Sequence, residues 1–362
     1  MKESLHDILD KSLDGNRLTD EELVFLLEQK SAEEQSAVFE AARKMRNRFF
    51  GNKVFLYGFV YFSTYCRNNC TFCYFRKASD KPERYRKTED EILETAQQLK
   101  QSGIHLIDLT MGEDGYFTDE NRRLVHLVKR IKEEVGLPVM VSPGVVSADI
   151  TEELARAGAD WYALYQETHS RPLFRKIRIG QSYDERMEAK KEAARQGMLL
   201  EEGLMTGIGD TTRDIVYSMR VMEKLRISQG RTMTFVPQEG TPLEHQKTGS
   251  HRQELLNIAV MRLLFGDILI PASLDVDGIR GLEERLMAGA NVVTSLIPPR
   301  KGFAGVANPT CDIDDGFRTV DGIRDILMKC GLTAASVPEY QFWIDRRKKT
   351  VREKGSDGIC QG

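Results

Sequence analysis

The sequence has no excess of charge of either sign. Its 52 basic residues are nearly balanced by 55 acidic ones, which leaves a formal net charge of -3 in a chain of 362 residues. Proteins that hold nucleic acid or anionic membranes through a general field present a strongly basic surface. We therefore expect no nucleic-acid partner and no membrane partner, and the balance favours a small-molecule substrate.

Long apolar runs are also missing, because none approaches the roughly 18 residues of a membrane-spanning helix. The first residues, MKESLHDILDKSL, mix charged and apolar side chains and lack the apolar segment of a secretory signal. Cysteine is scarce: three of the six lie within eight residues, and the others are Cys311, Cys330 and Cys360. This distribution favours metal ligands in a reducing compartment over a disulfide framework, so we predict a cytoplasmic protein.

No internal repeat or low-complexity linker divides the chain. From Lys53 onward, short apolar runs alternate with amphipathic stretches, as in parallel strands covered by helices. The eight runs are VFLYGFVYF, IHLIDLT, LPVMVS, ADWYALY, GMLLEEGLM, RTMTFVP, DILIPASL and ANVVTSL. The alternation predicts an α/β fold with a (β/α)8 TIM-type barrel, which commonly takes about 250 residues. A doubly wound open sheet would give the same alternation, so the pattern alone leaves it open.

We predict three parts of the chain. Residues 1–50 form a helical N-terminal extension, because Thr19 with Glu22 and Ser31 with Glu34 match the capping-box pattern that starts helices. Residues 51–335 form the barrel, and residues 336–362 form a C-terminal helix and tail. We expect the N-terminal extension to plug or brace the N-terminal end of the barrel.

The cysteine triplet carries the most specific signal. Cys66, Cys70 and Cys73 follow the first predicted strand in the order Cys-Arg-Asn-Asn-Cys-Thr-Phe-Cys. Three thiolates cannot complete a tetrahedral structural zinc site, but they leave one iron of a cubane cluster without a protein ligand. A zinc ion with a distant fourth ligand such as His169, or three unrelated thiols, would be the simpler alternatives.

The CxxxCxxC pattern, with the aromatic Phe72 before its last cysteine, resembles the radical S-adenosylmethionine enzymes. The resemblance implies that Cys66, Cys70 and Cys73 hold a [4Fe-4S] cluster and that the methionyl group of S-adenosylmethionine chelates the open iron. It also implies that Phe72 packs on the adenine, although a buried core phenylalanine would look the same. An electron from a donor such as flavodoxin or ferredoxin would then release a 5'-deoxyadenosyl radical.

Further motifs follow later strands, at the end of the barrel where active sites lie. The Gly112-Glu113-Asp114 segment resembles the motif that holds the methionine amine, with Met111 in place of its first glycine. By resemblance to the biotin-synthase-like branch, Glu167 supplies a carboxylate to the cofactor ribose and Arg186 binds the cofactor carboxylate. We expect these residues to contact the cofactor: Gly112, Glu113, Asp114, Ser142, Glu167, Arg186, Gly207 and Gly209. Each motif alone would read as a solvated loop, a surface charge or a plain turn.

A narrower resemblance is carried by VYFSTYCRNNCTFCYF, LTMGED, LYQET, MTFVPQEGTPLE and IPASLD, in this order. Together they resemble the methylornithine synthase family of pyrrolysine biosynthesis. The resemblance implies conversion of L-lysine to (3R)-3-methyl-D-ornithine by radical fragmentation and recombination. It also implies that Asp108 and Asp275 bind the two ammonium groups of lysine, and that Arg231 and Ser273 bind its carboxylate. Either aspartate could instead pair with a core arginine or cap a helix.

Three other functions compete with this one. Biotin synthase shares the motif pattern but needs a second cluster, and strands three to seven contain no cysteine for it. A maturase of the [FeFe]-hydrogenase active site shares the Glu167 and Arg186 pattern and has no such requirement. A zinc-stabilised protein that binds a ligand at the barrel mouth without chemistry belongs to a different class.

Overall fold

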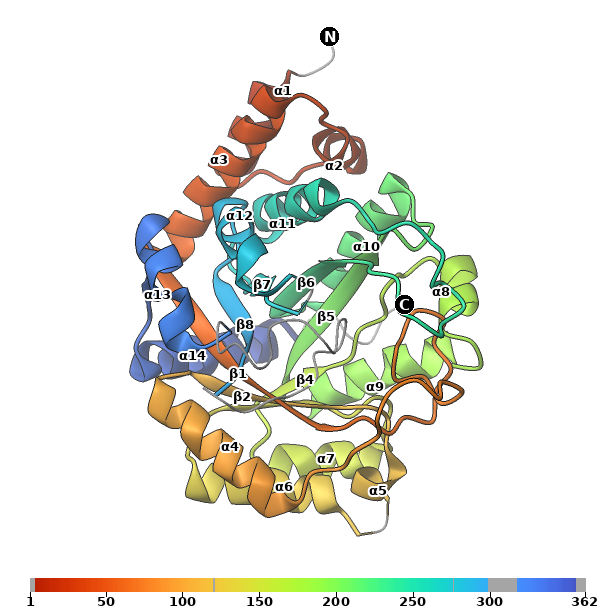
Figure 1. Ribbon diagram of the computed structural model, residues 1–362. Helices are drawn as coiled ribbons and strands as arrows, with labels where there is room; N and C mark the ends of the chain where they lie inside the picture. The colour runs from red at the N-terminus through yellow and green to blue at the C-terminus, as the bar shows by residue number, and fades with distance from the viewer. Residues whose placement is uncertain (1–3, 120, 276, 299–317, 356–362) are drawn as a thin grey trace.

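The computed structural model describes residues 4–119, 121–275, 277–298 and 318–355. Eight parallel strands form the centre of the molecule (Figure 1). The strands are β1 (Lys53–Ser63), β2 (Leu106–Met111), β3 (Val139–Ser142), β4 (Trp161–Ala163), β5 (Leu199–Thr206), β6 (Gln229–Thr234), β7 (Pro271–Ser273) and β8 (Val292–Leu296). All eight lie within the predicted apolar runs or overlap them.

The sheet closes on itself. Hydrogen-bonded neighbours follow chain order from β1 to β6, and β8 pairs with both β1 and β7. Between β6 and β7, Gly230 N donates to Leu269 O at 3.0 Å and Leu269 N donates to Ser228 O at 3.0 Å, which completes the ring. This order confirms the (β/α)8 barrel, because a doubly wound sheet would leave two edges open.

Helices cover the outside of the barrel, and this explains why the strands are apolar on both faces. The helices are α1 (Leu5–Leu13), α2 (Asp20–Leu27), α3 (Ala32–Phe50), α4 (Glu89–Ser102), α5 (Gly115–Thr118), α6 (Arg123–Glu134), α7 (Ala148–Arg156), α8 (Arg171–Ile177), α9 (Tyr183–Arg195), α10 (Thr212–Leu225), α11 (His251–Phe265), α12 (Leu282–Met287), α13 (Val320–Lys329) and α14 (Val337–Gly355). A 3₁₀ turn, η1 (Gly278–Gly281), precedes α12, and a two-residue strand, β9 (Thr333–Ala334), pairs with β1.

The N-terminal helices begin where the capping boxes predict. Thr19 and Ser31 each accept a hydrogen bond from the backbone three residues on, and Glu22 and Glu34 bond back. These helices do not plug the barrel, but the end of α3 does contact its N-terminal end, where Phe50 packs on Phe55. They lie along its outer side, where α3 packs on α11 and α12 and α2 packs on α10 and α11 (Figure 1).

The C-terminal helix closes the barrel's N-terminal end instead. Tyr340 and Ile344 of α14 are fully buried and belong to one cluster with residues of the barrel interior and with Phe50 at the end of α3. The Tyr340 and Tyr57 hydroxyls lie 2.6 Å apart, and the Trp343 ring stacks on Trp161 with centroids 5.9 Å apart. The barrel therefore opens towards solvent at its other end, where the predicted site lies.

Within the described ranges, the longest helices are too polar to cross a lipid bilayer. Cys311, Cys360 and the predicted tail beyond residue 355 lie outside the described residues. The division of the chain at residues 50 and 335 stays a prediction.

Candidate functional site

A cavity of about 210 Å³ lies at the carboxyl ends of the barrel strands. This is the end at which TIM-barrel enzymes carry their active sites. Most of the predicted site residues line it, namely Cys66, Cys70, Phe72, Cys73, Asp108, Gly112, Glu113, Ser142, Glu167, Arg186, Arg231 and Asp275. The fold therefore brings the cysteine triplet and the strand-end motifs to one place.

The cysteine loop is fixed against the end of β2. Arg67 N donates to Glu113 O at 3.1 Å, so the two segments share a backbone hydrogen bond. At Gly112 a side chain is impossible, since an added Cβ would lie 2.2 Å from Tyr65 O. Gly112 is thus required by the close approach of the cysteine loop. Met111, which stands where the family has another glycine, lines the cavity.

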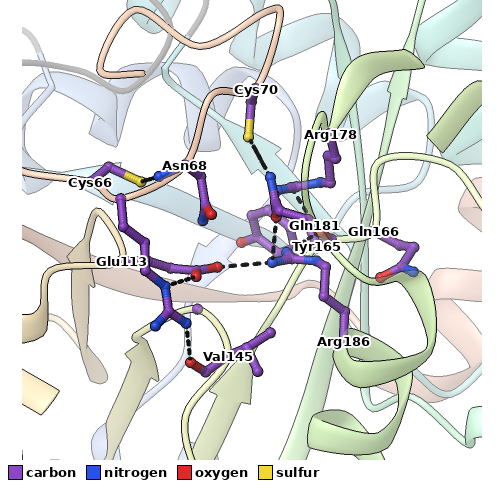
Figure 2. A network of polar contacts seen from close by, with 12 residues as sticks. Cys66, Asn68, Cys70, Glu113, Val145, Tyr165, Gln166, Arg178, Gln181 and Arg186 are labelled. Atoms are coloured by element: carbon purple, nitrogen blue, oxygen red, sulfur yellow. Dashed lines mark hydrogen bonds and ion pairs between the residues drawn. The ribbon is translucent and has the colours of Figure 1, made fainter. Parts of the chain in front are cut away.

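Two of the three thiols accept hydrogen bonds. Gln181 Nε2 lies 3.0 Å and Arg178 Nη1 lies 3.7 Å from Cys70 Sγ, and the backbone N–H of Asn68 lies 3.5 Å from Cys66 Sγ (Figure 2). Burial raises the pKa of Cys73 and of Cys66, so these thiols stay protonated until a metal displaces the protons. Donors aimed at sulfur then stabilise the thiolates.

A single zinc ion with a distant ligand such as His169 is the simpler alternative. Within the described part of the chain, no three histidine, cysteine or acidic side chains converge closely enough to hold one ion. His169 is fully buried elsewhere, with its Nε2 3.5 Å from Glu202. Each iron of a cubane needs only one thiolate, so three cysteines around one cavity fit a [4Fe-4S] cluster with one open iron.

A network of buried charges forms the wall beside the cysteines (Figure 2). Arg186 pairs with Glu113 at 3.0 Å and also donates to Tyr165 O at 2.7 Å. Arg178 donates to the same carbonyl at 2.8 Å and pairs with Glu167 at 2.7 Å. Arg178 therefore connects a cluster cysteine to the carboxylate that the resemblance assigns to the ribose.

Glu167 occupies an unusual backbone conformation. Its φ is 66°, in the left-handed region that residues other than glycine seldom adopt. Its Oε2 has no hydrogen-bond partner among the described residues, although the side chain is buried and lines the cavity. A buried carboxylate oxygen without a donor is costly, and a ligand hydroxyl would satisfy it. Burial raises the pKa of Glu167, and Arg178 and Arg186 oppose that rise.

The strained segment is held from behind by a second buried group. Glu202 of β5 accepts from the backbone N–H of Gln166 at 2.6 Å, and the side chain of Lys190 bonds to Glu202 and to Gln166 Oε1. Burial opposes the charge on Glu202, but Lys190 and His169 outweigh it and lower the pKa of Glu202 to about 2. This ion pair fixes the residue that precedes Glu167.

The other end of the cavity carries a different set of charges. Arg231 pairs with Glu201 at 2.8 Å and donates to Ser273 Oγ at 3.3 Å. Asp275 accepts from Ser273 Oγ at 3.2 Å and pairs with Arg318 at 2.8 Å. Ser273 thus does not line the cavity, but it bonds to two residues that do. The pairing of Asp275 with a core arginine, one of the simpler alternatives, also occurs.

Asp108 lies in the same region with its carboxylate least compensated. It is buried, and its Oδ1 accepts a hydrogen bond from Thr110 Oγ1 at 3.0 Å. Burial raises the pKa of Asp108 to about 7, and the carboxylate of Glu201 adds to the rise while Arg231 opposes it. For Arg231, burial lowers the pKa, but Glu201 outweighs it and raises the value above the usual range.

Three predicted cofactor residues lie outside the lining of this cavity. Asp114 does not line the cavity, because its carboxylate is taken up by Arg86 at 2.7 Å and Ser63 at 2.6 Å. Gly207 and Gly209 lie in the turn after β5 with positive φ values of 88° and 101°. An added Cβ on Gly207 would lie 2.6 Å from Gly249 Cα. The glycine turn therefore admits a neighbouring chain segment rather than lining the cavity.

The comparisons with known proteins agree with this site. The family model for the radical SAM superfamily matches residues 60–222. Over 332 residues the chain is 44% identical to the 3-methylornithine synthase of Methanosarcina barkeri, which covers 92% of this chain and 95% of that protein. The chain belongs to the 3-methylornithine synthase family. A crystal structure of methylornithine synthase (PylB) matches with a TM-score of 0.89 at 44% identity, covering 93% of this chain and 99% of that one.

A more distant relative is the [FeFe] hydrogenase maturase subunit HydE of Thermotoga maritima. It is 32% identical over 260 residues, which covers 71% of this chain and 74% of that protein. Membership of the 3-methylornithine synthase family confirms the predicted resemblance and the enzyme class. It also confirms the cofactors, because radical SAM enzymes use a [4Fe-4S] cluster and S-adenosylmethionine. The roles of the single site residues stay predictions.

Sequence reasoning missed three buried charges of this site. Arg178, Glu201 and Arg318 each pair with a predicted residue, and none belongs to a motif in the sequence. Glu201 lies within a strand run, GMLLEEGLM, where two adjacent acidic residues are out of place among buried apolar ones. That contrast was the available signal, since buried charges are kept only when they are paired.

Proposed function

We propose that this protein converts L-lysine to 3-methylornithine for pyrrolysine biosynthesis. The observation that carries the proposal is the buried charge set at the inner end of the cavity. Three carboxylates, Asp108, Glu201 and Asp275, face two guanidinium groups, Arg231 and Arg318. When all five are ionised the set carries one net negative charge, and lysine with two ammonium groups and one carboxylate carries one net positive charge. Its binding neutralises the pocket.

The proposed contacts follow from this match. Asp108 and Asp275 accept hydrogen bonds from the two ammonium groups, and Arg231 with Ser273 binds the carboxylate. Each of these side chains is at most 6% exposed, so bound lysine would be removed from water. Asp108 needs no proton transfer role, because its task is to stay ionised and hold a cation.

The cofactor end is proposed separately. Cys66, Cys70 and Cys73 hold the cluster, and Glu167 and Arg186 with Phe72 and Ser142 hold S-adenosylmethionine. When bound, these groups would supply a 5'-deoxyadenosyl radical as the agent for removing hydrogen from lysine. The chain's own task is then to keep both substrate fragments in place and to exclude quenchers. The N-terminal end of the barrel, which α14 closes, keeps water from entering on that side.

We further propose the cellular setting. The described cysteines, including the three of the cluster site, form no disulfide, which suits a reducing cytoplasm. The chain would take its electron from a small redox protein such as flavodoxin or ferredoxin. Neither nucleic acid nor a membrane is expected to take part.

An anaerobic assay tests the function. The reconstituted protein should hold about four irons with broad absorption near 400 nm. With S-adenosylmethionine and a reductant it should form 3-methylornithine only when L-lysine is present, as measured by mass spectrometry. One zinc and no colour would contradict the cluster. A coloured protein that leaves lysine unchanged would contradict L-lysine as the substrate and would favour the function of a hydrogenase maturase.

A further inference from the structure

A basic groove lies outside the barrel, next to the cysteine loop. Although the chain is net negative, residues 64–87 hold seven basic residues against two acidic ones. They contribute to a surface groove of about 490 Å³ whose lining includes Arg67, Lys77, Arg84 and Arg86. The positive charge that the whole chain lacks is thus concentrated at one place.

One cysteine links this groove to the interior. Cys66 lines both the inner cavity and the outer groove, and its side chain is partly exposed. Cys70, by contrast, is 8% exposed and lines the inner cavity without reaching the groove. Cys73 is also partly exposed, but it lines the inner cavity and not the groove. Cys66 is thus the cysteine of the triplet through which a bound cluster would face the groove.

The rim of the groove has the composition of a protein contact. The exposed rings of Tyr65 and Tyr116 flank the Arg86 guanidinium at 4.0 and 5.0 Å from their centroids, and the Arg123 guanidinium lies 4.1 Å from the Tyr116 centroid. Tyrosine and arginine are the residues enriched at interfaces. These ring and guanidinium contacts exist without a partner, so they need not form on docking, which lowers its entropy cost.

We propose that this groove is the docking site of an acidic, one-electron redox protein. The inference rests on the proposed function, because it needs a cluster on the triplet. In the docked pair the donor loses one electron and the cluster gains it, so no further co-reactant is required. Electron transfer slows steeply with distance, and in the groove an outside donor faces the cluster through Cys66. Its charge fits an acidic partner, and electrostatic steering suits a brief encounter.

The groove's own charges are not all available. Arg67 is paired with Glu113, and Arg86 is paired with Asp114, so both also hold the site together. Lys77 is exposed and has no partner among the described contacts, while Arg123 bonds to Tyr116 O at the groove's edge. These two residues can be changed without breaking an ion pair of the cofactor wall.

The test compares Lys77→Glu/Arg123→Glu with Lys30→Glu/Lys224→Glu, which changes the net charge equally on the α2 and α10 side of the barrel. The cluster-loaded proteins are mixed with a reduced, acidic flavodoxin in the presence of S-adenosylmethionine, and flavodoxin oxidation is followed by stopped flow. The groove variant should react about tenfold or more slowly at low salt and lose most of its salt dependence. The control variant should match the parent.

A second reductant separates docking from damage. Reduced methyl viologen is a small cation that needs no docking surface. At high salt, where attraction to the introduced carboxylates is screened, it should reduce the parent and both variants at equal rates. If the groove variant is slow with the dye as well, Lys77→Gln/Arg123→Gln replaces it and should show a smaller loss with flavodoxin alone. Equal flavodoxin rates in parent and groove variant would overturn the docking site and leave the proposed function standing. A reconstituted chain without iron would overturn both.

Discussion

Arg231 holds the carboxylate end of the proposed substrate pocket. Replacing it with alanine removes the cation and leaves Glu201 buried without its partner. In comparable buried pairs this lowers the free energy of unfolding by about 3–5 kcal/mol. We expect Arg231→Ala to lower kcat/KM for lysine at least about 100-fold, while iron content and S-adenosylmethionine binding stay at the parent level. Turnover, iron content and cofactor binding are measured on the same preparation.

Thr294, which contacts the same guanidinium group, provides a matched control. Thr294 Oγ1 accepts from Arg231 Nη1 at 3.1 Å, and Thr294→Val removes this neutral partner and leaves the charge. Its effect should be about 1 kcal/mol, or several-fold in kcat/KM. Undiminished lysine turnover by Arg231→Ala would remove the role assigned to this residue.

Asp108 should give the reaction its pH dependence. Because burial raises the pKa of Asp108 to about 7, the carboxyl is increasingly protonated below neutral pH and then binds an ammonium group poorly. We expect kcat/KM for lysine to fall about tenfold per pH unit below 7 and to level off above about 8. Asp108→Asn should be poorly active at every pH and should show no such slope.

The pH dependence of folding stability tests the raised pKa of Asp108 independently. A carboxyl whose folded-state pKa is raised contributes stability below its unfolded pKa of 3.8 and loses it as the pH rises through about 7. Asp108→Asn removes that loss, so it should raise the melting temperature over the parent at pH 8 and raise it less at pH 5. An equal rise of the melting temperature at both pH values would mean that the pKa of Asp108 is not raised in the folded protein.

At the scale of single elements, α14 is the part whose role is least expected. Tyr340 is fully buried against Phe55 and Tyr57 at the N-terminal end of the barrel. Tyr340→Ala should lower the free energy of unfolding by about 3–5 kcal/mol, because it removes a large aromatic ring from a closed core. Urea unfolding followed by intrinsic fluorescence measures the change.

Phe342 provides the control on the same helix. Its side chain is 70% exposed, so Phe342→Ala should change the free energy of unfolding by no more than about 0.5 kcal/mol. If the two variants were equally stable, α14 would be a surface helix and the barrel would be closed in some other way.

The strands and the cysteine loop could be predicted because their signals are local. A strand covered on both faces is an apolar run, and CxxxCxxC needs only eight residues in a row. The function of α14 could not be predicted, since the partners of Tyr340 and Trp343 on β1 and β4 lie far away in the chain.

The same distinction divides the site. Arg178 and Glu167 lie near each other in the chain, but their pairing depends on the left-handed turn at Glu167, which no motif announces. The place of Asp114 could not be predicted, because a sequence motif gives the order of residues and not the direction of each side chain. The turn after β2 directs Glu113 into the cavity and Asp114 towards Arg86.

For the molecule as a whole, the outer helices α1 to α3 extend the apolar core of the barrel. Buried residues of α2 and α3 belong to the same apolar cluster as residues of α10, α11 and the strands. Arg46 of α3 is buried and donates to Leu286 O at 2.7 Å and to Ala290 O at 3.3 Å, which ties the helix to the α12 region. Removing these helices would expose apolar surface on α10 and α11 and leave carbonyls without donors.

Deleting residues 1–45 should therefore lower the melting temperature strongly or leave the protein insoluble, and a point variant gives a milder form of the same test.

Leu26 of α2 is fully buried, whereas the neighbouring Phe25 is 41% exposed. Leu26→Ala should cost about 2–5 kcal/mol of unfolding free energy and Phe25→Ala much less, as measured by urea unfolding. Because the cluster site lies at the mouth of the same barrel, we expect Leu26→Ala to retain its iron at low temperature and to lose it at the temperature where it unfolds. A parent-like melting temperature in both Leu26→Ala and the deletion would show that the N-terminal helices are an appendage and that the barrel is stable without them.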